Sequence, residues 1–164
     1  MRYYHLVYTC LLGLALLAAC QYSQAGGKLE GETITVAKLG NTATLVVPSL
    51  AQNFTEALRD KFLQQTRLKL TDREGDLQFS GNITRYEVVP LTIQAGDQAS
   101  QNRMNLTVHI RFTHRLAPEQ SWEQDFTNFI DFPAEQNAQA ETLYLPELVN
   151  KLVQDIFTKT LSNW

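Results

Sequence analysis

The sequence predicts an α+β fold, a two-layer sandwich with two helices packed on one face of a roughly four-stranded mixed sheet. Three observations predict it. Residues 103–113 alternate between polar and apolar side chains, as a half-buried strand does. Residues 49–66 and 145–161 instead repeat apolar side chains every three or four positions, as amphipathic helices do. Each helix needs an apolar surface to cover, and the apolar face of the strands is the available one.

The amino terminus is typical of an export signal that ends at a lipidation site. Arg2 is the only Lys or Arg before Lys28, and residues 6–19 are almost wholly apolar. This apolar run is shorter than the ~20 residues that span a bilayer, so a transmembrane anchor is the weaker interpretation. Leu17-Ala18-Ala19-Cys20 resembles the lipobox of bacterial lipoproteins. The small residues before the cysteine would also suit an ordinary signal peptidase, but a cysteine directly after Leu-Ala-Ala favours acylation of Cys20.

This interpretation divides the chain into three parts. We expect a lipoprotein signal peptide over residues 1–19, a lipidated tether over 20–31 and a single α+β domain over 32–164. Gln21, rather than Asp, follows Cys20, so the usual mark for retention in the inner membrane is missing. By analogy with lipoproteins that share this lipobox, we expect a lipid-anchored protein on the periplasmic side of the outer membrane.

The amino-terminal half predicts one strand and one helix. In residues 32–39, Ile34 and Val36 alternate with threonines, which predicts the first strand. The apolar residues 45–47 are too few to assign. A helix is expected to begin at Ser49 as its N-cap, with Gln52 completing a capping box, and to end near residue 66.

Three further strands and a second helix are expected. Residues 76–86 alternate until Pro90 ends the strand, residues 103–113 form the clearest strand, and residues 121–131 place Trp122, Phe126 and Ile130 on one side. The turn at 117–120 is short, which predicts a hairpin. Pro146 suits the first turn of the closing helix, and Trp164 is expected to end its apolar face. The polar side of these strands is expected to carry Asn82, Thr84, Tyr86, Asn105, Thr107, His109, Arg111, Thr113 and Thr127.

Composition and motifs argue against several functions. Without the signal, 13 Lys and Arg face 17 Asp and Glu, and there is no polybasic tract, which argues against binding nucleic acid or anionic lipid by charge alone. Cys10 lies in the signal and Cys20 is acylated, so no disulfide and no Cys/His zinc site is expected in the mature chain. His109 and His114 lie five apart, hence on opposite faces of a strand. With no Gly-x-Ser-x-Gly turn and no phosphate loop, we expect neither an enzyme nor a cofactor.

Several stretches together resemble the LptE-type lipopolysaccharide-assembly outer-membrane lipoproteins. The likeness covers almost the whole mature chain, in order and spacing. It is carried by Cys20 with Tyr22-Ser23, residues 50–62, residues 65–70, residues 75–81 with Ile83, Thr84 and Tyr86, Asn102-Arg103, Phe126, residues 155–157 and residues 162–164.

The resemblance implies a fold and a function. Family members pack two helices on a four-stranded sheet, plug the large β-barrel LptD and help that barrel to assemble. They are also proposed to contact lipopolysaccharide, and none of this is catalysis. A free-standing periplasmic lipoprotein that binds a small or lipidic ligand through its open sheet face is the alternative.

The polar side of the sheet supplies the candidate contact residues. Arg103, His109, Arg111 and Arg115 share the polar parity of the long strand, and arginine can fork onto phosphate or carboxylate. Arg85 has the parity of Ile83, so it is the weakest candidate unless the strand has already ended there. The alternative to a binding role is an ordinary solvated side chain for each arginine. For the whole face, the alternative is simple exposure to water.

Overall fold

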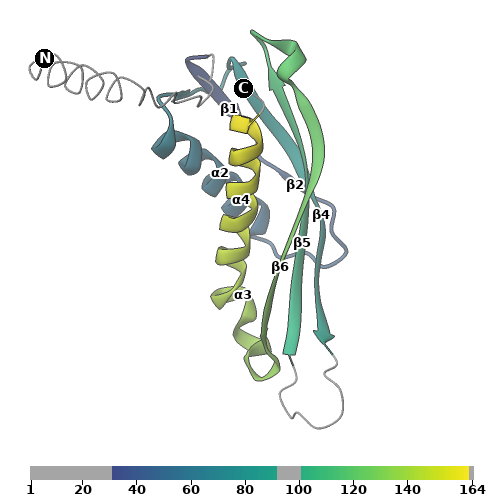
Figure 1. Ribbon diagram of the computed structural model, residues 1–164. Coiled ribbons are helices and arrows are strands. Elements are labelled where there is room, and N and C mark those ends of the chain that lie inside the picture. Colours follow the sequence, from purple (N-terminus) through teal and green to yellow (C-terminus); the bar gives the residue numbers. More distant parts are fainter. Residues whose placement is uncertain (1–30, 92–100, 163–164) are drawn as a thin grey trace, which may run out of the picture.

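A computed structural model describes residues 31–91 and 101–162. The expected signal peptide, almost all of the expected tether, Cys20 and Trp164 lie outside the described residues. Figure 1 shows helices on one side and long strands on the other, which confirms the α+β sandwich. The elements are β1 (Thr33–Val36), β2 (Gly40–Asn41), α2 (Leu50–Gln65), β3 (Lys69–Leu70), β4 (Leu77–Leu91), β5 (Gln101–His114), β6 (Trp122–Pro133), α3 (Ala140–Leu143) and α4 (Leu145–Ser162), with short 3-10 helices at Pro118–Gln120 and Ala134–Gln139.

The sheet is mixed, as expected, but within the described residues it has six strands rather than about four. Its order is β3-β1-β4-β5-β6, with β2 pairing beside β1 along β4. The two added strands, β2 and β3, are only two residues long. β1 and β2 run parallel to β4, whereas β4, β5 and β6 form an antiparallel meander. Pairing of β5 with β6 confirms the expected hairpin.

The helices α2 and α4 cover the inner face of this sheet (Figure 1). The long strands place their apolar parity there: Met104, Leu106, Val108 and Ile110 are all fully buried. The expected apolar face of α4 is buried throughout, from Leu145 to Phe157, and Leu161 is partly buried against the same core. The apolar side chains of the strands and of the two helices therefore pack into one core. The other face of the sheet is left uncovered by these helices.

Ser49 stands at the N-cap position of α2, as expected, but the expected capping box is wrong. Its side chain makes no cap hydrogen bond, because the Ser49 backbone is already helical (φ −88°, ψ −10°). A side-chain cap normally requires an extended backbone at that residue. The Gln52 amide instead donates to Glu56 at 2.9 Å. The end of α2 at Thr66 agrees with the prediction.

Two expectations about β4 are corrected. A bulge interrupts its pairing with β5, where Ile83 stands opposite Val108 but Arg85 stands opposite Thr107. The extra residue reverses the parity, so Tyr86 is buried in the core (2% exposed) rather than on the polar side. Pro90 does not end the strand, which continues to Leu91. Within the described ranges β4 has only β5 beside it at this point, so the missing N–H of proline is tolerated at an edge.

Candidate partner-binding surface

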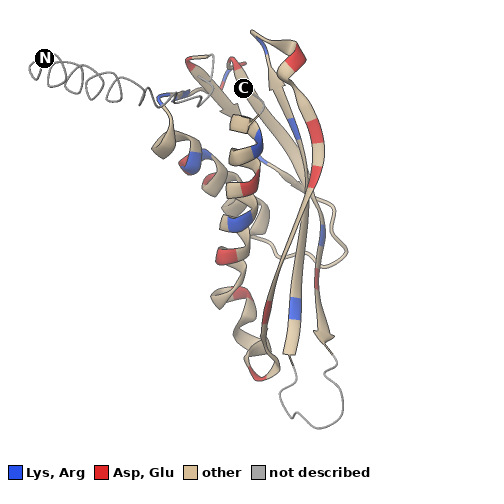
Figure 2. Cartoon of the chain, viewed as in Figure 1, with Lys and Arg blue, Asp and Glu red and all other residues tan. Residues whose placement is uncertain are grey.

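The sheet face turned away from α2 and α4 is polar, and we call it the outer face. Register defines it, because residues directly opposite each other on antiparallel strands share a side. On β5 and β6 the outer rows are Arg103 with Asp131, Asn105 with Phe129, Thr107 with Thr127, His109 with Asp125, and Arg111 with Glu123. On β4 the matching residues are Val89, Glu87, Arg85, Asn82 and Ser80. Figure 2 shows the acidic positions along β6 beside the basic positions of β5.

Four charged side chains form a continuous network at one end of the outer face. Arg111 forks onto Glu123, with Nε donating to Oε2 at 2.7 Å and Nη2 donating to Oε1 at 3.0 Å. His109 lies between two carboxylates, with Nε2 2.8 Å from Oε1 of Glu123 and Nδ1 2.7 Å from Oδ1 of Asp125. A ring that donates at both nitrogens is the protonated imidazolium.

The pKa values in this network shift as the geometry requires. Hydrogen bonds to Glu123, and then to Asp125, raise the pKa of His109 above its ordinary value. The guanidinium of Arg111, and then the imidazole of His109, lower the pKa of Glu123 to about 2. Each group therefore favours the charged form of the other, and the network is internally neutralised.

A second pair lies further along the outer face. Arg103 Nε donates to Oδ1 of Asp131 at 2.7 Å, and Nη2 donates to Oδ2 at 2.9 Å. The same guanidinium lies 3.9 Å from the ring centroid of Phe129. This fork lowers the pKa of Asp131 and raises that of Arg103.

The two remaining arginines differ in their partners. The bulge in β4 turns Arg85 to the outer face, where it has no hydrogen-bond or ion-pair partner among the described residues. It lines a hollow of about 780 Å³ with Thr44, Leu45 and Glu87. Arg115 instead pairs with Asp76, whose Oδ1 accepts from Nη2 at 2.9 Å. Asp76 also accepts from the backbone of Glu32 and from Thr33, which ties β1 to the ends of β4 and β5.

The sequence-predicted site residues therefore separate into groups. His109 and Arg111 share one network, Arg103 stands in a different pair, Arg85 lines the hollow, and Arg115 lies just beyond the end of β5. His114 is buried on the opposite side of β5 from His109, as the five-residue spacing predicts. That the five candidate residues contact a partner stays a prediction. Sequence reasoning missed Phe129 and the acidic residues of β6, and alternation along 121–131 is the signal that places Phe129 beside them.

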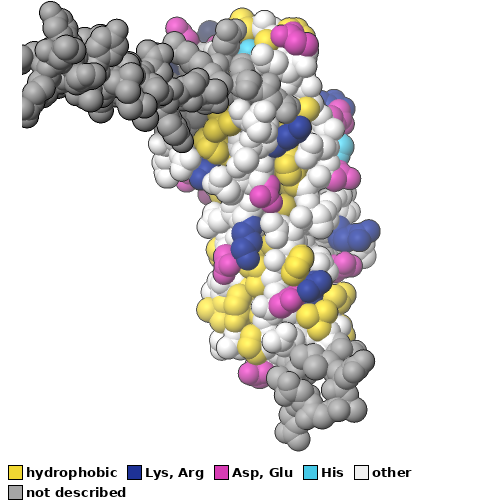
Figure 3. All heavy atoms as spheres, in the orientation of Figure 1, with side chains coloured by type: hydrophobic (Ala, Val, Ile, Leu, Met, Phe, Trp, Pro, Cys, Tyr) yellow, Lys and Arg dark blue, Asp and Glu magenta, His cyan; other side chains and the backbone are white. Residues whose placement is uncertain are grey.

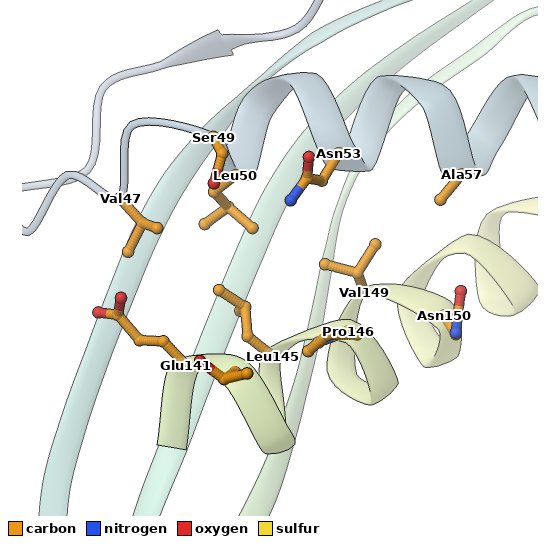
Figure 4. Close-up of a pocket in the computed structure, with 11 residues that line it drawn as sticks. Val47, Ser49, Leu50, Asn53, Ala57, Glu141, Leu145, Pro146, Val149 and Asn150 are labelled. Carbon is orange, nitrogen blue, oxygen red and sulfur yellow. The ribbon is translucent and has the colours of Figure 1, made fainter. Parts of the chain in front are cut away.

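A pocket of about 430 Å³ opens on the helical side of the molecule. Figure 4 shows Leu50 of α2 pointing toward Leu145 and Val149 of α4 across it. Glu141 of α3 lines this pocket. Burial, and then the carboxylate of Glu141, raise the pKa of the Tyr86 phenol to about 12. Within residues 31–91 and 101–162, no acidic, histidine or cysteine side chains form a cluster able to hold a metal ion.

None of the helices in the described part of the chain is long and apolar enough to cross a membrane.

A protein-family model matches most of the chain. The model of the LptE family, described as lipopolysaccharide-assembly, matches residues 31–160. The chain belongs to the LptE family. Members of the LptE family serve lipopolysaccharide assembly, and theirs is not a catalytic role.

Solved structures with the same fold include several lipoproteins. Rare lipoprotein B from Shewanella oneidensis aligns with a TM-score of 0.56 at 12% identity, over 78% of this LptE-family chain and 94% of that one. A lipoprotein B from Nitrosomonas europaea aligns with a TM-score of 0.54 at 15% identity, over 80% of this chain and 83% of that one. A minor lipoprotein from Acinetobacter baumannii aligns with a TM-score of 0.51 at 12% identity, over 80% of this chain and 94% of that one. At these identities the likeness shows the fold alone. No curated protein matches the chain.

Proposed function

We propose that this chain is the plug and assembly partner of an LptD-type β-barrel in the transport of lipopolysaccharide to the outer leaflet. The barrel interior would receive the outer face of the sheet. Acylated Cys20 would hold the protein on the periplasmic side of the outer membrane. An extended tether over residues 20–31 reaches at most about 40 Å, which lets the domain enter a barrel near its anchor.

The observation that carries this proposal is the charge compensation of the outer face. Arg103 and Arg111 each fork onto a carboxylate of β6, and His109 is held by two. The interior of a large barrel is mostly polar and offers hydrogen-bonding groups on every strand. The β5 and β6 part of the outer face, whose charges are already paired, can be covered by such a wall without leaving an isolated buried ion, which would be costly.

Arg85 supports a contact with lipopolysaccharide beside this docking role. It is exposed, lacks a partner among the described residues and lines a hollow. A guanidinium in this state can fork onto a phosphate or carboxylate of the glycolipid. The same observation favours the alternative function, a free-standing periplasmic lipoprotein that binds a small or lipidic ligand on its open sheet face.

Extraction of the tagged full chain from outer membranes under mild detergent separates these functions. We expect an LptD-type barrel to elute with the protein in a stable complex. A chain that elutes as a monomer, without any β-barrel, would support the free-standing lipoprotein instead. Depletion of the chain should also lower the amount of folded barrel and the lipopolysaccharide exposed on the cell surface.

A charge exchange tests whether the outer face makes the contact. Arg111→Glu places three acidic residues around His109 and should reduce recovery of the barrel, whereas combining it with Glu123→Arg restores a pair and should restore recovery. Leu63→Ala on α2 is the matched control, because Leu63 is exposed on the helical layer. Circular dichroism of each variant checks that the fold persists. Equal recovery with Arg111→Glu would exclude this end of the outer face.

Lipidation is tested separately, by mass spectrometry of the mature amino terminus. We expect Cys20 to be the first residue and to carry acyl chains, and Cys20→Ser to leave the protein in the soluble periplasmic fraction. A mature protein that begins after Cys20, or one without lipid, would instead indicate ordinary secretion.

A further inference from the structure

Phe129 is the one exposed aromatic side chain among residues 31–91 and 101–162. Its exposed fraction is 46%, whereas the other phenylalanines of this part of the chain are buried. It lies on the outer face, opposite Asn105, because Ile130 next to it points into the core. An exposed phenylalanine on a mostly polar face has no role in the core of this fold. Aromatic side chains are enriched in protein interfaces.

Two neighbours hold this ring and its surroundings in place. The Cζ atom of the Arg103 guanidinium lies over the Phe129 ring, 3.9 Å from the ring centroid. Asp131 fixes that guanidinium by two hydrogen bonds of 2.7 and 2.9 Å. A third of each of these charged side chains is exposed, with 33% for Arg103 and 34% for Asp131. The three side chains therefore form one preorganised unit, which we call the Phe129 anchor.

The outer face differs on either side of Thr107. Towards Arg111 it carries charged and hydroxyl side chains without an exposed large apolar residue among the described ones. Towards Arg103 the Phe129 anchor is flanked by Val89, and Asn105 donates to Glu87 at 3.4 Å. Phe129 is thus the exposed large apolar residue of the described outer face, and it lies at the Arg103 end. Figure 3 shows hydrophobic side chains in the lower half of its view over the helical layer as well as near the strands.

The charges of the Phe129 anchor decide which partner it fits. The guanidinium of Arg103 is already paired with the carboxylate of Asp131 through two hydrogen bonds. An incoming phosphate or carboxylate would therefore have to displace that carboxylate. Asp131 is likewise occupied, which disfavours a cationic partner. One side of the ring is covered by the guanidinium, and the rest is open to an uncharged apolar or aromatic side chain.

We infer that the Phe129 anchor is the binding hot spot of the outer face and takes an apolar or aromatic side chain from the inner wall of the β-barrel partner. This inference rests on the proposed function and names the contact that carries most of its affinity. Hot spots are enriched in aromatic and arginine residues, are surrounded by contacts that exclude water and contribute little themselves, and bind tightly when they are ordered in advance. The neutralised network around His109 then supplies register and shape, with little of the affinity.

Affinity measurements with the purified full chain and an LptD-type barrel of the same organism test the inference. Phe129→Ala should raise the dissociation constant by about tenfold or more, mainly through faster dissociation. Two control variants should each change the dissociation constant less than about threefold. Leu63→Ala truncates an exposed apolar residue on α2, and Thr127→Ala truncates a polar residue on the outer face itself. Matched melting temperatures of the free proteins show that folding is not the cause.

The outcomes separate the two proposals. If the wild type binds the barrel and Phe129→Ala binds equally well, the anchor is wrong while the plug role stands. If the wild type does not bind the barrel, both fail. A photoreactive phenylalanine analogue at position 129 gives an independent readout, with position 63 as control. We expect a crosslink to a barrel peptide at position 129 alone, and a crosslink to lipopolysaccharide instead would overturn the inference.

Discussion

Gly81 of β4 lies against the backbone carbonyl of His109 on β5, so closely that a β-carbon at Gly81 would overlap that oxygen. Gly81→Ala must therefore push β4 away from β5 in the middle of the longest pairing of the sheet. We expect a loss of about 1–3 kcal/mol in the free energy of unfolding, the usual range for overpacking. Urea denaturation measures it. Ser80→Ala, on the neighbouring exposed residue, should stay within about 0.5 kcal/mol, and a Gly81→Ala loss as small as that would show that the strands can separate freely.

Asp76 ties three parts of the sheet together, so its removal should cost more than that of its ionic partner. The carboxylate accepts hydrogen bonds from the backbone of Glu32 and Thr33, from the Thr33 hydroxyl and from Arg115. We expect the melting temperature to fall most for Asp76→Ala, less for Arg115→Ala, and hardly for the exposed Asp72→Ala. An equal effect of the first two would mean that the ion pair alone matters.

The same contacts make this residue sensitive to acid. Arg115, and then the backbone N–H of Glu32, hold the pKa of Asp76 well below its ordinary value of 3.8. A lowered folded-state pKa contributes stability above the unfolded-state pKa and loses it as the pH falls through the folded value. The stability difference between wild type and Asp76→Asn should therefore be full above about pH 5 and shrink below pH 4. A difference that does not change with pH would contradict this assignment.

His109 should give the opposite pH dependence. Its carboxylate partners raise its pKa in the folded protein above the ordinary 6.5. The stability that it contributes is then fully present below about pH 6.5 and is lost as the pH rises through the folded value. We expect the difference in melting temperature between wild type and His109→Gln to be largest near pH 6 and smallest near pH 9.

Salt and NMR complete this test. The His109 side chain is 36% exposed, so added salt should reduce its contribution. Titration of the ring by NMR should give a pKa above 6.5. A stability difference that grows toward high pH would show that the ring is neutral in the folded protein.

The two layers and their faces are predictable from the sequence because burial follows a local period. Alternation in 103–113 places Leu106 and Ile110 in the core, and spacing in 145–161 gives the buried side of α4. Hydrogen bonding at the start of α2 is not predictable in this way. Serine and glutamine stand at the right positions, but the Ser49 backbone has already turned helical.

Pair partners on the outer face are the second thing that the pattern does not predict. A turn over 117–120 would centre the hairpin between Pro118 and Glu119, whereas the observed register is centred on Ala117 because Phe112 stands opposite Trp122. Opposing residues on β5 and β6 therefore differ from those of a tight hairpin. Only the true register brings Arg103 to Asp131 and Arg111 to Glu123, so the charge compensation of the candidate surface was hidden.

The bulge in β4 is the third, and it makes a sharp prediction about deletions. Ile83 pairs with Val108 and Arg85 with Thr107, so Thr84 is the additional residue. Deleting Thr84 leaves Ile83 inward, Arg85 outward and Tyr86 inward on a regular ladder. We expect this deletion to change the free energy of unfolding by about 1 kcal/mol or less. Deleting Ser80, equally exposed on the same strand, instead turns Leu77 and Phe79 out of the core. It should cost at least the ~2–5 kcal/mol of a large core truncation, as urea denaturation would show, because every residue on one side of the deletion changes face.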